Sequence, residues 1–156
     1  TNYLALVGKK EPSLEEKCGY FGEKLVLFAQ ELGLNTCWVA MTYSKIKTAF
    51  QVGKGEKLCI VIALGYGETQ GVPHKSKSME EVVQLNGPVP EWFQKGVQAA
   101  LLAPTAINQQ KFLFRLDKNR VSVKAGFGFN TKIDMGIVKY HFEIGAGKEH
   151  FQWELS

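Results

Sequence analysis

The nine-residue run KLCIVIALG, from Lys57 to Gly65, is apolar at almost every position. Its length suits a β-strand and falls far short of a membrane span. A strand without alternating polar residues is typical of one that is covered on both faces, so other strands and helices must surround it. With 156 residues, the chain is long enough for one compact domain, residues 1–156, and too short for two.

Further elements are predicted before this strand. The segment Tyr3–Val7 has strand character, and a helix should follow from Ser13 to about Leu32, with Gly33 as its left-handed stop. The pattern Ser13-x-x-Glu16 predicts a capping box at the start of this helix. The apolar side that we expect it to bury holds Tyr20, Phe21, Leu25, Leu27, Phe28 and Leu32.

Helices and strands continue to alternate along the rest of the chain. The predicted elements are a strand in GLNTCWVAM, a short helix from Ser44 to about Phe50, a helix that Ser78-x-x-Glu81 caps, a helix over Glu91–Leu102 with Pro90 at its start, a hairpin of KFLFRL and VSVKA around the turn DKNR, a helix in KIDMGIVKYHFEIGAG, and a closing strand in HFQWEL. Because a hairpin and short elements interrupt the alternation, the fold class is α+β, with a mixed or antiparallel central sheet flanked by helices.

Two helical segments resemble each other. GEKLVLFAQELG (Gly22 to Gly33) and GIVKYHFEIGAG (Gly136 to Gly147) have the same length between glycines, with Phe28 and Phe142 in register. Chance similarity of two amphipathic helices is one explanation. The other is a duplicated half-fold, with sub-halves of about residues 1–87 and 88–156 and a pseudo-twofold axis, which would make the chain an internal pseudo-dimer.

Charge and cysteine usage limit the partners and the compartment. The net charge of +4 comes from scattered lysines, with Arg115 and Arg120 as the only arginines, which predicts neither a nucleic-acid partner nor a membrane partner. The three cysteines, which we expect at core or helix positions, form no CxxC pair, so a reducing cytoplasm fits best. Because the chain opens directly on a strand without an initiator Met, we expect that it begins partway into a longer protein.

The sequence gives little support for a nucleophilic catalytic site or for a metal site. Cys37 could act as a thiol nucleophile with His74, His141 or His150 as its base, but its surroundings resemble no cysteine-protease signature. The histidines have no companion at metal-ligand spacing, and His141 is expected to be a packed imidazole. An unrelated α+β enzyme that uses Cys37 stays as one alternative.

Three other segments together describe a flat, phosphorylated ligand. Lys75 and Lys77, at i and i+2 of a loop, would point the same way in an extended segment and suit a phosphate monoester. The hydroxyl of Thr105 and the amides of Asn108 and Gln110 can read the edge of a heterocycle. The segment GLNTCWVA follows a helix stop with small residues and backbone groups, which suits contact with a flat ring.

These three segments resemble motifs of the flavin-dependent nitroreductase family. They stand as GLNTCWVA (Gly33 to Ala40), GYGETQGVPHKSK (Gly65 to Lys77) and APTAINQQKF (Ala103 to Phe112) and span most of the chain. The Asn-Gln motif follows the other two, whereas it precedes them in the usual member. That order is similar to a branch of nitroreductases in which a duplicated half replaces the second subunit, so either a monomeric pseudo-dimer or a homodimer is expected.

The resemblance implies FMN as the cofactor. Lys75 and Lys77 would hold its phosphate. The segment Thr36, Cys37, Trp38, Val39 and Ala40 would lie along the ring, and Pro104, Thr105, Ala106 and Asn108 would contact it from the other half. The flavin would take hydride from NAD(P)H and pass electrons to a nitroaromatic, a quinone or a similar acceptor, with no catalytic acid, base or metal. The alternative is a non-catalytic member that binds a flavin-like ligand as a sensor or carrier.

Three departures from the family pattern concern flavin affinity. The family's Arg-Arg-Ser motif near the first helix, which also grips the phosphate, has no counterpart in the chain. Lys77 stands where many members have arginine, which keeps the charge and loses the bidentate fork. Lys111 also replaces the usual proline of the family's turn.

Overall fold

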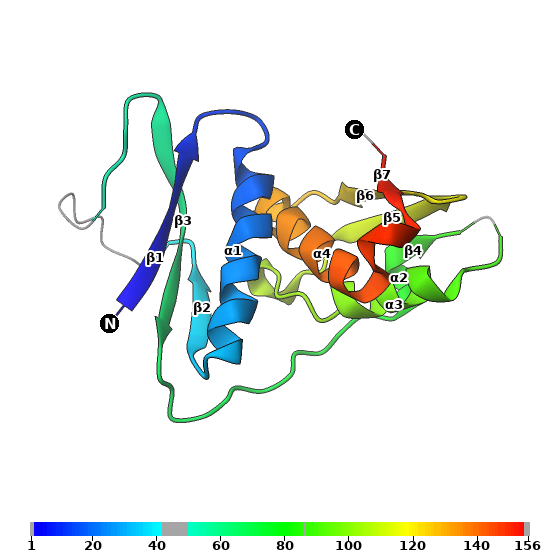
Figure 1. Cartoon of the computed structure of the whole chain (residues 1–156), viewed down its shortest axis with the longest axis horizontal. Coiled ribbons are helices and arrows are strands. Elements are labelled where there is room, and N and C mark those ends of the chain that lie inside the picture. The colour runs from blue at the N-terminus through cyan, green and yellow to red at the C-terminus, as the bar shows by residue number, and fades with distance from the viewer. Residues whose placement is uncertain (1, 42–49, 86, 155–156) are drawn as a thin grey trace.

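The computed structural model describes residues 2–41, 50–85 and 87–154 (Figure 1). The short helix predicted from Ser44 to Phe50 lies outside the described residues for almost its whole length. The rest of the chain forms two sheets with helices between them, which confirms the α+β class. Where one central sheet was expected, an antiparallel and a mixed sheet stand at opposite ends of the molecule in Figure 1.

The first sheet consists of β1 (Asn2–Lys9), β2 (Asn35–Val39) and β3 (Glu56–Gly65). Its order is β1-β3-β2, and both pairings are antiparallel. The apolar run Lys57–Gly65 is therefore a strand, as predicted, and it lies in the centre of this sheet. Only its middle residues, Ile60, Val61 and Ile62, are buried, so the expected cover on both faces is found only in the middle of the strand.

The helix α1 (Leu14–Glu31) begins and ends close to the predicted bounds. Its C-terminal stop is confirmed: Gly33 has a φ of +76°, and the amide of Leu34 donates to the carbonyl of Ala29 over 2.9 Å. The predicted capping box at Ser13 is wrong. The Ser13 hydroxyl donates instead to Glu11, and Glu16 pairs with Lys139 of the last helix.

The predicted buried side of α1 is also wrong. Four of its residues, Phe21, Leu25, Phe28 and Leu32, are exposed. The buried residues of the helix are Leu14, Cys18, Gly19, Gly22, Glu23 and Ala29. The cause is the crossing of α1 with α4 (Thr131–Ala146), where the two backbones touch: a Cβ on Gly136 would overlap the carbonyl oxygen of Glu16. A close helix crossing needs small residues, and the hydrophobic pattern alone does not reveal where one occurs.

The second sheet has the order β4-β5-β6-β7. The predicted hairpin is confirmed as β5 (Phe112–Asp117) and β6 (Arg120–Ala125), and the short strands β4 (Val83–Gln84) and β7 (Gln152–Trp153) pair parallel to its two edges. The helix α2 (Met79–Val82) has the capping box predicted from Ser78 and Glu81. The helix α3 (Glu91–Ala100) begins one residue after Pro90, its N-cap, and short 3₁₀ turns occupy Ala106–Asn108 and Lys148–His150.

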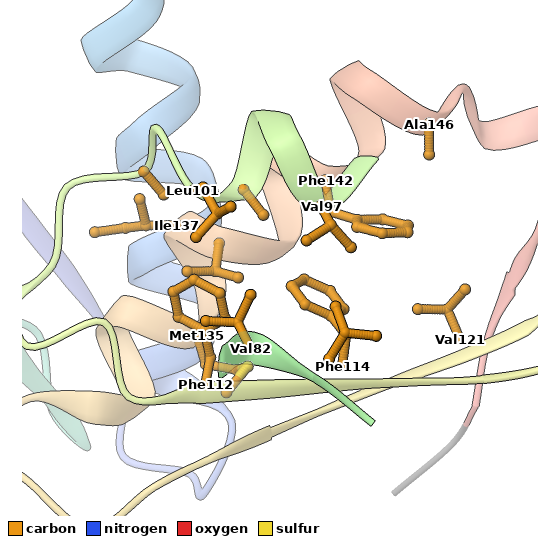
Figure 2. Packing of buried hydrophobic residues seen from close by; sticks show 14 of the residues in the cluster. Val82, Val97, Leu101, Phe112, Phe114, Val121, Met135, Ile137, Phe142 and Ala146 are labelled. Atoms are coloured by element: carbon orange, nitrogen blue, oxygen red, sulfur yellow. The ribbon is translucent and has the colours of Figure 1, made fainter. Parts of the chain in front are cut away.

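The main hydrophobic core lies between the second sheet and the helices α3 and α4 (Figure 2). Three fully buried phenylalanines, Phe93, Phe114 and Phe142, form its centre, with the Phe114 and Phe142 rings stacked at 4.8 Å between centroids. Fully burying one such side chain stabilises the fold by roughly 1.5 to 3 kcal/mol. Phe28, the counterpart of Phe142 in the sequence similarity, is 56% exposed, so the two lie in different surroundings. The division into sub-halves 1–87 and 88–156 stays a prediction.

Candidate functional site

A cleft of about 210 Å³ lies where the end of β2, the loop after α3 and the start of α4 meet. Most of its walls are apolar. The lining residues are Trp38, Ala40, Ile60, Pro104, Thr105, Ala106, Ile107, Phe129, Asn130, Ile133, Asp134 and Ile137. The cleft thus brings together two of the segments that the sequence analysis singles out, although more than sixty residues separate them in the chain.

Only part of the predicted ring-contact segment on β2 faces this cleft. Trp38 and Ala40 line it, whereas Thr36, Cys37 and Val39 do not. Alternate side chains of a strand point to opposite faces, so Cys37 and Val39 are directed away from Trp38 and Ala40. Cys37 is exposed, contrary to the expected core position, because its side chain points to the face of β2 opposite to that of Trp38. Its sulfur contacts the backbone oxygen of Trp38 at 3.6 Å.

The indole of Trp38 is anchored from behind the cleft. Its Nε1 donates to Glu23 Oε2 over 3.2 Å, and the other carboxylate oxygen of Glu23 pairs with His141 Nε2 at 2.7 Å. Glu23 is only 1% exposed and His141 is buried, so His141 is a packed imidazole, as expected. The role of Glu23 was not predicted from the sequence, where the available signal is an acidic residue on the same face of the helix as Gly19 and Gly22.

The second wall is the loop Pro104–Gln110, whose backbone is strained. Ile107, Asn108 and Gln110 have φ values of +48°, +53° and +45°. A positive φ is costly for a residue with a side chain, most of all for a β-branched one such as Ile107. Ile107 also projects into solvent, with 88% of its surface exposed at the edge of the cleft. Other interactions must therefore hold this loop in place.

Asp134 of α4 supplies two of these interactions. Its Oδ1 accepts the amide of Ala106 over 3.0 Å, and its Oδ2 accepts Nε2 of Gln109 over 2.7 Å. Burial raises the pKa of the Asp134 carboxyl, and these two hydrogen bonds offset part of that effect. Asp134 also lines the cleft. It was missed in the sequence, where the only signal is an acid on the apolar side of the helical segment KIDMG.

Gln110 and Asn108 join this loop to the lysine loop. The amide of Lys77 donates to Gln110 Oε1 over 2.8 Å, and the carbonyl of Lys75 accepts both Gln110 Nε2, over 2.9 Å, and Asn108 Nδ2, over 3.0 Å. Asn108 was expected to contact a ring, but its side chain does not line the cleft and instead binds the protein's own backbone. Pro104, Thr105 and Ala106 line the cleft.

The two lysines lie in the segment that Figure 1 shows crossing from β3 to α2, and neither lines the cleft. The Lys75 side chain is exposed. The Lys77 side chain is half-buried, and its ammonium donates to the carbonyl of Gln110 over 3.0 Å. The backbone of both residues is held by the loop Pro104–Gln110, so the lysine positions depend on that loop.

His74 belongs to the same network. Its Nδ1 lies 2.8 Å from the Asn108 side-chain oxygen, which can only accept, so the proton is assigned to Nδ1. Nε2 then carries a lone pair, and this atom is buried without a hydrogen-bond partner in the described structure. A buried acceptor of this kind costs free energy, which adds to the strain of the neighbouring loop.

The fold is that of an α+β protein and is similar to a nitroreductase structure. The chain belongs to the family described as Putative TM nitroreductase, whose family model matches residues 1–146. A solved structure, a putative nitroreductase from Thermotoga maritima MSB8, has a TM-score of 0.75 and 22% sequence identity to the chain. That similarity covers 92% of this chain and 59% of the other, so the chain spans about three-fifths of that protein. A search of curated proteins gave no match.

Two further observations concern the described residues alone. Residues 2–41, 50–85 and 87–154 contain no helix long and apolar enough to cross a membrane. Across the same residues, no group of three or more His, Cys, Asp or Glu side chains gathers in an arrangement that could hold a metal ion.

Proposed function

We propose that the protein is an FMN-dependent oxidoreductase that passes electrons from NAD(P)H to a nitroaromatic, a quinone or a similar acceptor. One observation carries the proposal: Trp38 of β2 and Ala40, which follows it, share one apolar cleft with Pro104, Thr105 and Ala106. These residues come from two of the three motifs that resemble flavin-dependent nitroreductases. Membership of the family supports the same chemistry.

The dimensions and walls of the cleft suit the ring of a flavin better than a whole FMN molecule. Sites that enclose an entire ligand usually measure about 300 Å³ or more, and this cleft measures about 210 Å³. Its walls are mainly apolar, as a planar aromatic system requires. In this proposal Trp38, Ala40, Pro104, Thr105 and Ala106 hold the ring, and the ribityl phosphate lies outside the cleft.

The phosphate is assigned to Lys75 and Lys77. The Lys75 ammonium is exposed and available to an anion. The Lys77 ammonium has three donor hydrogens, of which the carbonyl of Gln110 takes one. The bonds from Gln110 and Asn108 to the Lys75 carbonyl fix the loop that carries both side chains.

The side chains of the cleft position a ligand and do not need to react with it. When bound, FMN itself supplies the hydride and electron transfer. Trp38, held by Glu23, keeps one wall in place, and Asp134 holds the backbone of Ala106 in the other. The apolar residues around them exclude water from the space between the walls. This division of roles requires no catalytic acid or base.

The proposal also includes the cellular compartment and the oligomeric state of the protein. We place the protein in a reducing cytoplasm, which is consistent with its three free cysteines. A monomeric pseudo-dimer and a homodimer are both compatible with a site built by one chain.

Absorbance spectroscopy tests the proposal first. Purified protein is mixed with FMN, desalted and scanned; retained flavin bands followed by NAD(P)H oxidation with menadione or a nitroaromatic would support it. Lys75→Ala should weaken FMN binding by about 1 to 2 kcal/mol, or roughly 5- to 30-fold, the value of one charge-assisted contact. With Lys77→Ala added, the loss should reach about 2 to 4 kcal/mol. Lys54→Ala, at another exposed lysine, is the matched control. Protein that lets FMN pass through the column would refute the proposal.

A second candidate is a non-catalytic flavin carrier or sensor of the same fold. The observation that favours it is the use of the Asn108 amide and of one Lys77 donor hydrogen within the protein itself. These groups would then contribute less to a bound cofactor than the resemblance implies. Tight FMN binding without NAD(P)H oxidation, tested with several acceptors, would distinguish this candidate from the enzyme.

A further inference from the structure

Cys59 occupies an irregular position in β3. Leu6 of β1 pairs with Ile60, and the next residue, Val7, pairs with Leu58, so the pairing passes over Cys59. An extra residue of this kind forms a bulge, which bends the strand and changes the direction of its side chain. Cys59 and Ile60 both pack on the same hydrophobic core as a result, although neighbours in a regular strand face opposite sides.

Cys59 packs against the same hydrophobic cluster that contains Cys18, which lies on the buried face of α1. Lys57 and Glu15, whose charged groups are 3.6 Å apart, join the same helix and strand on the solvent side, two residues before Cys59 and three before Cys18. Both cysteines are free thiols in the structure. The bulge therefore directs the Cys59 side chain to the contact between β3 and α1 that also holds Cys18, 41 positions away in the chain.

The two thiols differ in reactivity. The hydrogen bond from Cys59 lowers the pKa of the Cys18 thiol, and the same bond raises the pKa of the Cys59 thiol. Cys18 is consequently the sulfur that more readily becomes a thiolate, the nucleophilic form. It also lines an open groove of about 490 Å³ between β1 and the start of α1, through which a small oxidant can reach it.

We propose that Cys18 and Cys59 are a redox-active pair that forms a reversible disulfide between α1 and β3 when a hydroperoxide oxidises it. With hydrogen peroxide, the Cys18 thiolate attacks the O–O bond; its sulfur becomes a sulfenic acid, and hydroxide leaves as water after taking a proton. The Cys59 sulfur then displaces the hydroxyl group, giving the S–S bond and a second water. Overall, two thiols and one hydrogen peroxide give one disulfide and two water molecules.

The disulfide would link a strand that lines the cleft to the helix that supports one of its walls. Ile60, the residue after Cys59, lines the cleft directly. Helix α1, which contains Cys18, also contains Glu23, the residue that holds the indole of Trp38. Oxidation would therefore link α1, which holds Trp38 through Glu23, covalently to β3. The redox state of the two cysteines would then change the rigidity of the cleft wall that Trp38 forms.

Thiol titration and peptide mapping test the proposal. The folded Cys37→Ser variant, which keeps only Cys18 and Cys59, is treated with a small excess of hydrogen peroxide, quenched, unfolded and titrated. The number of reactive thiols should fall from two to none and return to two after dithiothreitol. Wild-type chain, mapped in parallel without reduction, should yield one cross-linked peptide that contains both cysteines, so the result does not depend on the folding of a variant.

Control variants separate this bond from other oxidation products. Adding Cys18→Ser to Cys37→Ser should leave Cys59 without an intramolecular partner, and no cross-linked peptide should form. Two thiols remaining after peroxide, oxidation that dithiothreitol does not reverse, or a disulfide that joins two chains on a non-reducing gel would each overturn the proposal.

Discussion

Replacing Gln110 with alanine should loosen the contact between the lysine loop and the loop that lines the cleft. The Gln110 side chain makes three hydrogen bonds of 2.8 to 2.9 Å, with the amide of Lys77, the carbonyl of Lys75 and the amide oxygen of Asn108. The residue is only 3% exposed, so water does not readily replace these bonds. At about 1 kcal/mol net for each bond, Gln110→Ala should lower the free energy of unfolding by about 3 kcal/mol.

A second substitution at Gln110 tests the direction of these bonds. Gln110→Glu keeps an oxygen for the amide of Lys77 but turns the donor group into a carboxylate oxygen. That oxygen would face the carbonyl of Lys75 and the side-chain oxygen of Asn108, both acceptors. We expect Gln110→Glu to be at least as destabilising as alanine at neutral pH and less so in acid, where the carboxyl is protonated and can donate.

Urea unfolding and limited trypsin digestion measure the effect. Trypsin cleaves after lysine, so the rate of cleavage after Lys75 reports how firmly this loop is held; the rate should rise in Gln110→Ala. Gln94→Ala is the matched control, because Gln94 is exposed and makes a single side-chain bond of 3.4 Å, and its free energy of unfolding should change by less than about 0.5 kcal/mol. An unchanged urea midpoint together with unchanged cleavage in Gln110→Ala would refute the reasoning.

The remaining predictions concern the helix crossing and the two buried acids. Gly136→Ala would force a methyl group onto the backbone oxygen of Glu16, and should lower the free energy of unfolding by about 3 kcal/mol; Gly65→Ala, with nothing within 4 Å of the new carbon, is the control in the same chemical denaturation. Because burial raises the pKa of Asp134 above 3.8, the folded state binds more protons than the unfolded state just above that pH, so stability should fall as the pH rises through this range. Unfolding measured across that range in Asp134→Asn should lack this contribution, and parallel curves for the two proteins would contradict it. Glu23→Ala leaves a half-buried indole and a buried imidazole without their partner, and should cost about 2 to 4 kcal/mol in a denaturation curve that also reports a change in tryptophan fluorescence; wild-type fluorescence and stability would show that the buried carboxylate holds neither ring.

The two predicted capping boxes show where a local sequence motif predicts the structure and where it does not. Ser78 and Glu81 form the expected capping box, in which the amide of Ser78 donates to Glu81 Oε2 over 2.9 Å. Ser13 and Glu16 have the same spacing but do not form one: Glu16 pairs with Lys139, which is more than a hundred residues away in the chain. A local motif is realised only where tertiary contacts leave its groups available.

Prediction of the candidate site from the sequence has the same limit. The motifs around Trp38 and Pro104 could be found from residue type and order, and both line the cleft. The actual partner of Asn108 could not be found, because a side-chain amide in a loop binds a ligand or the protein's own backbone equally well. Asp134 and Gln110 were missed as structural supports, since only the folded chain shows which backbone groups they reach.

The sequence by itself determined the α+β class, most of the elements and their order, because hydrophobic periodicity, glycine stops and turn residues act over a few neighbouring residues. It also carried the resemblance to nitroreductases in three short motifs. Tertiary structure decided which side of α1 is buried, through the backbone contact at Gly136, and which way Cys59 points, through a bulge opposite Leu6 and Val7. Both depend on the meeting of segments far apart in the chain, and the pattern within either segment does not contain that information.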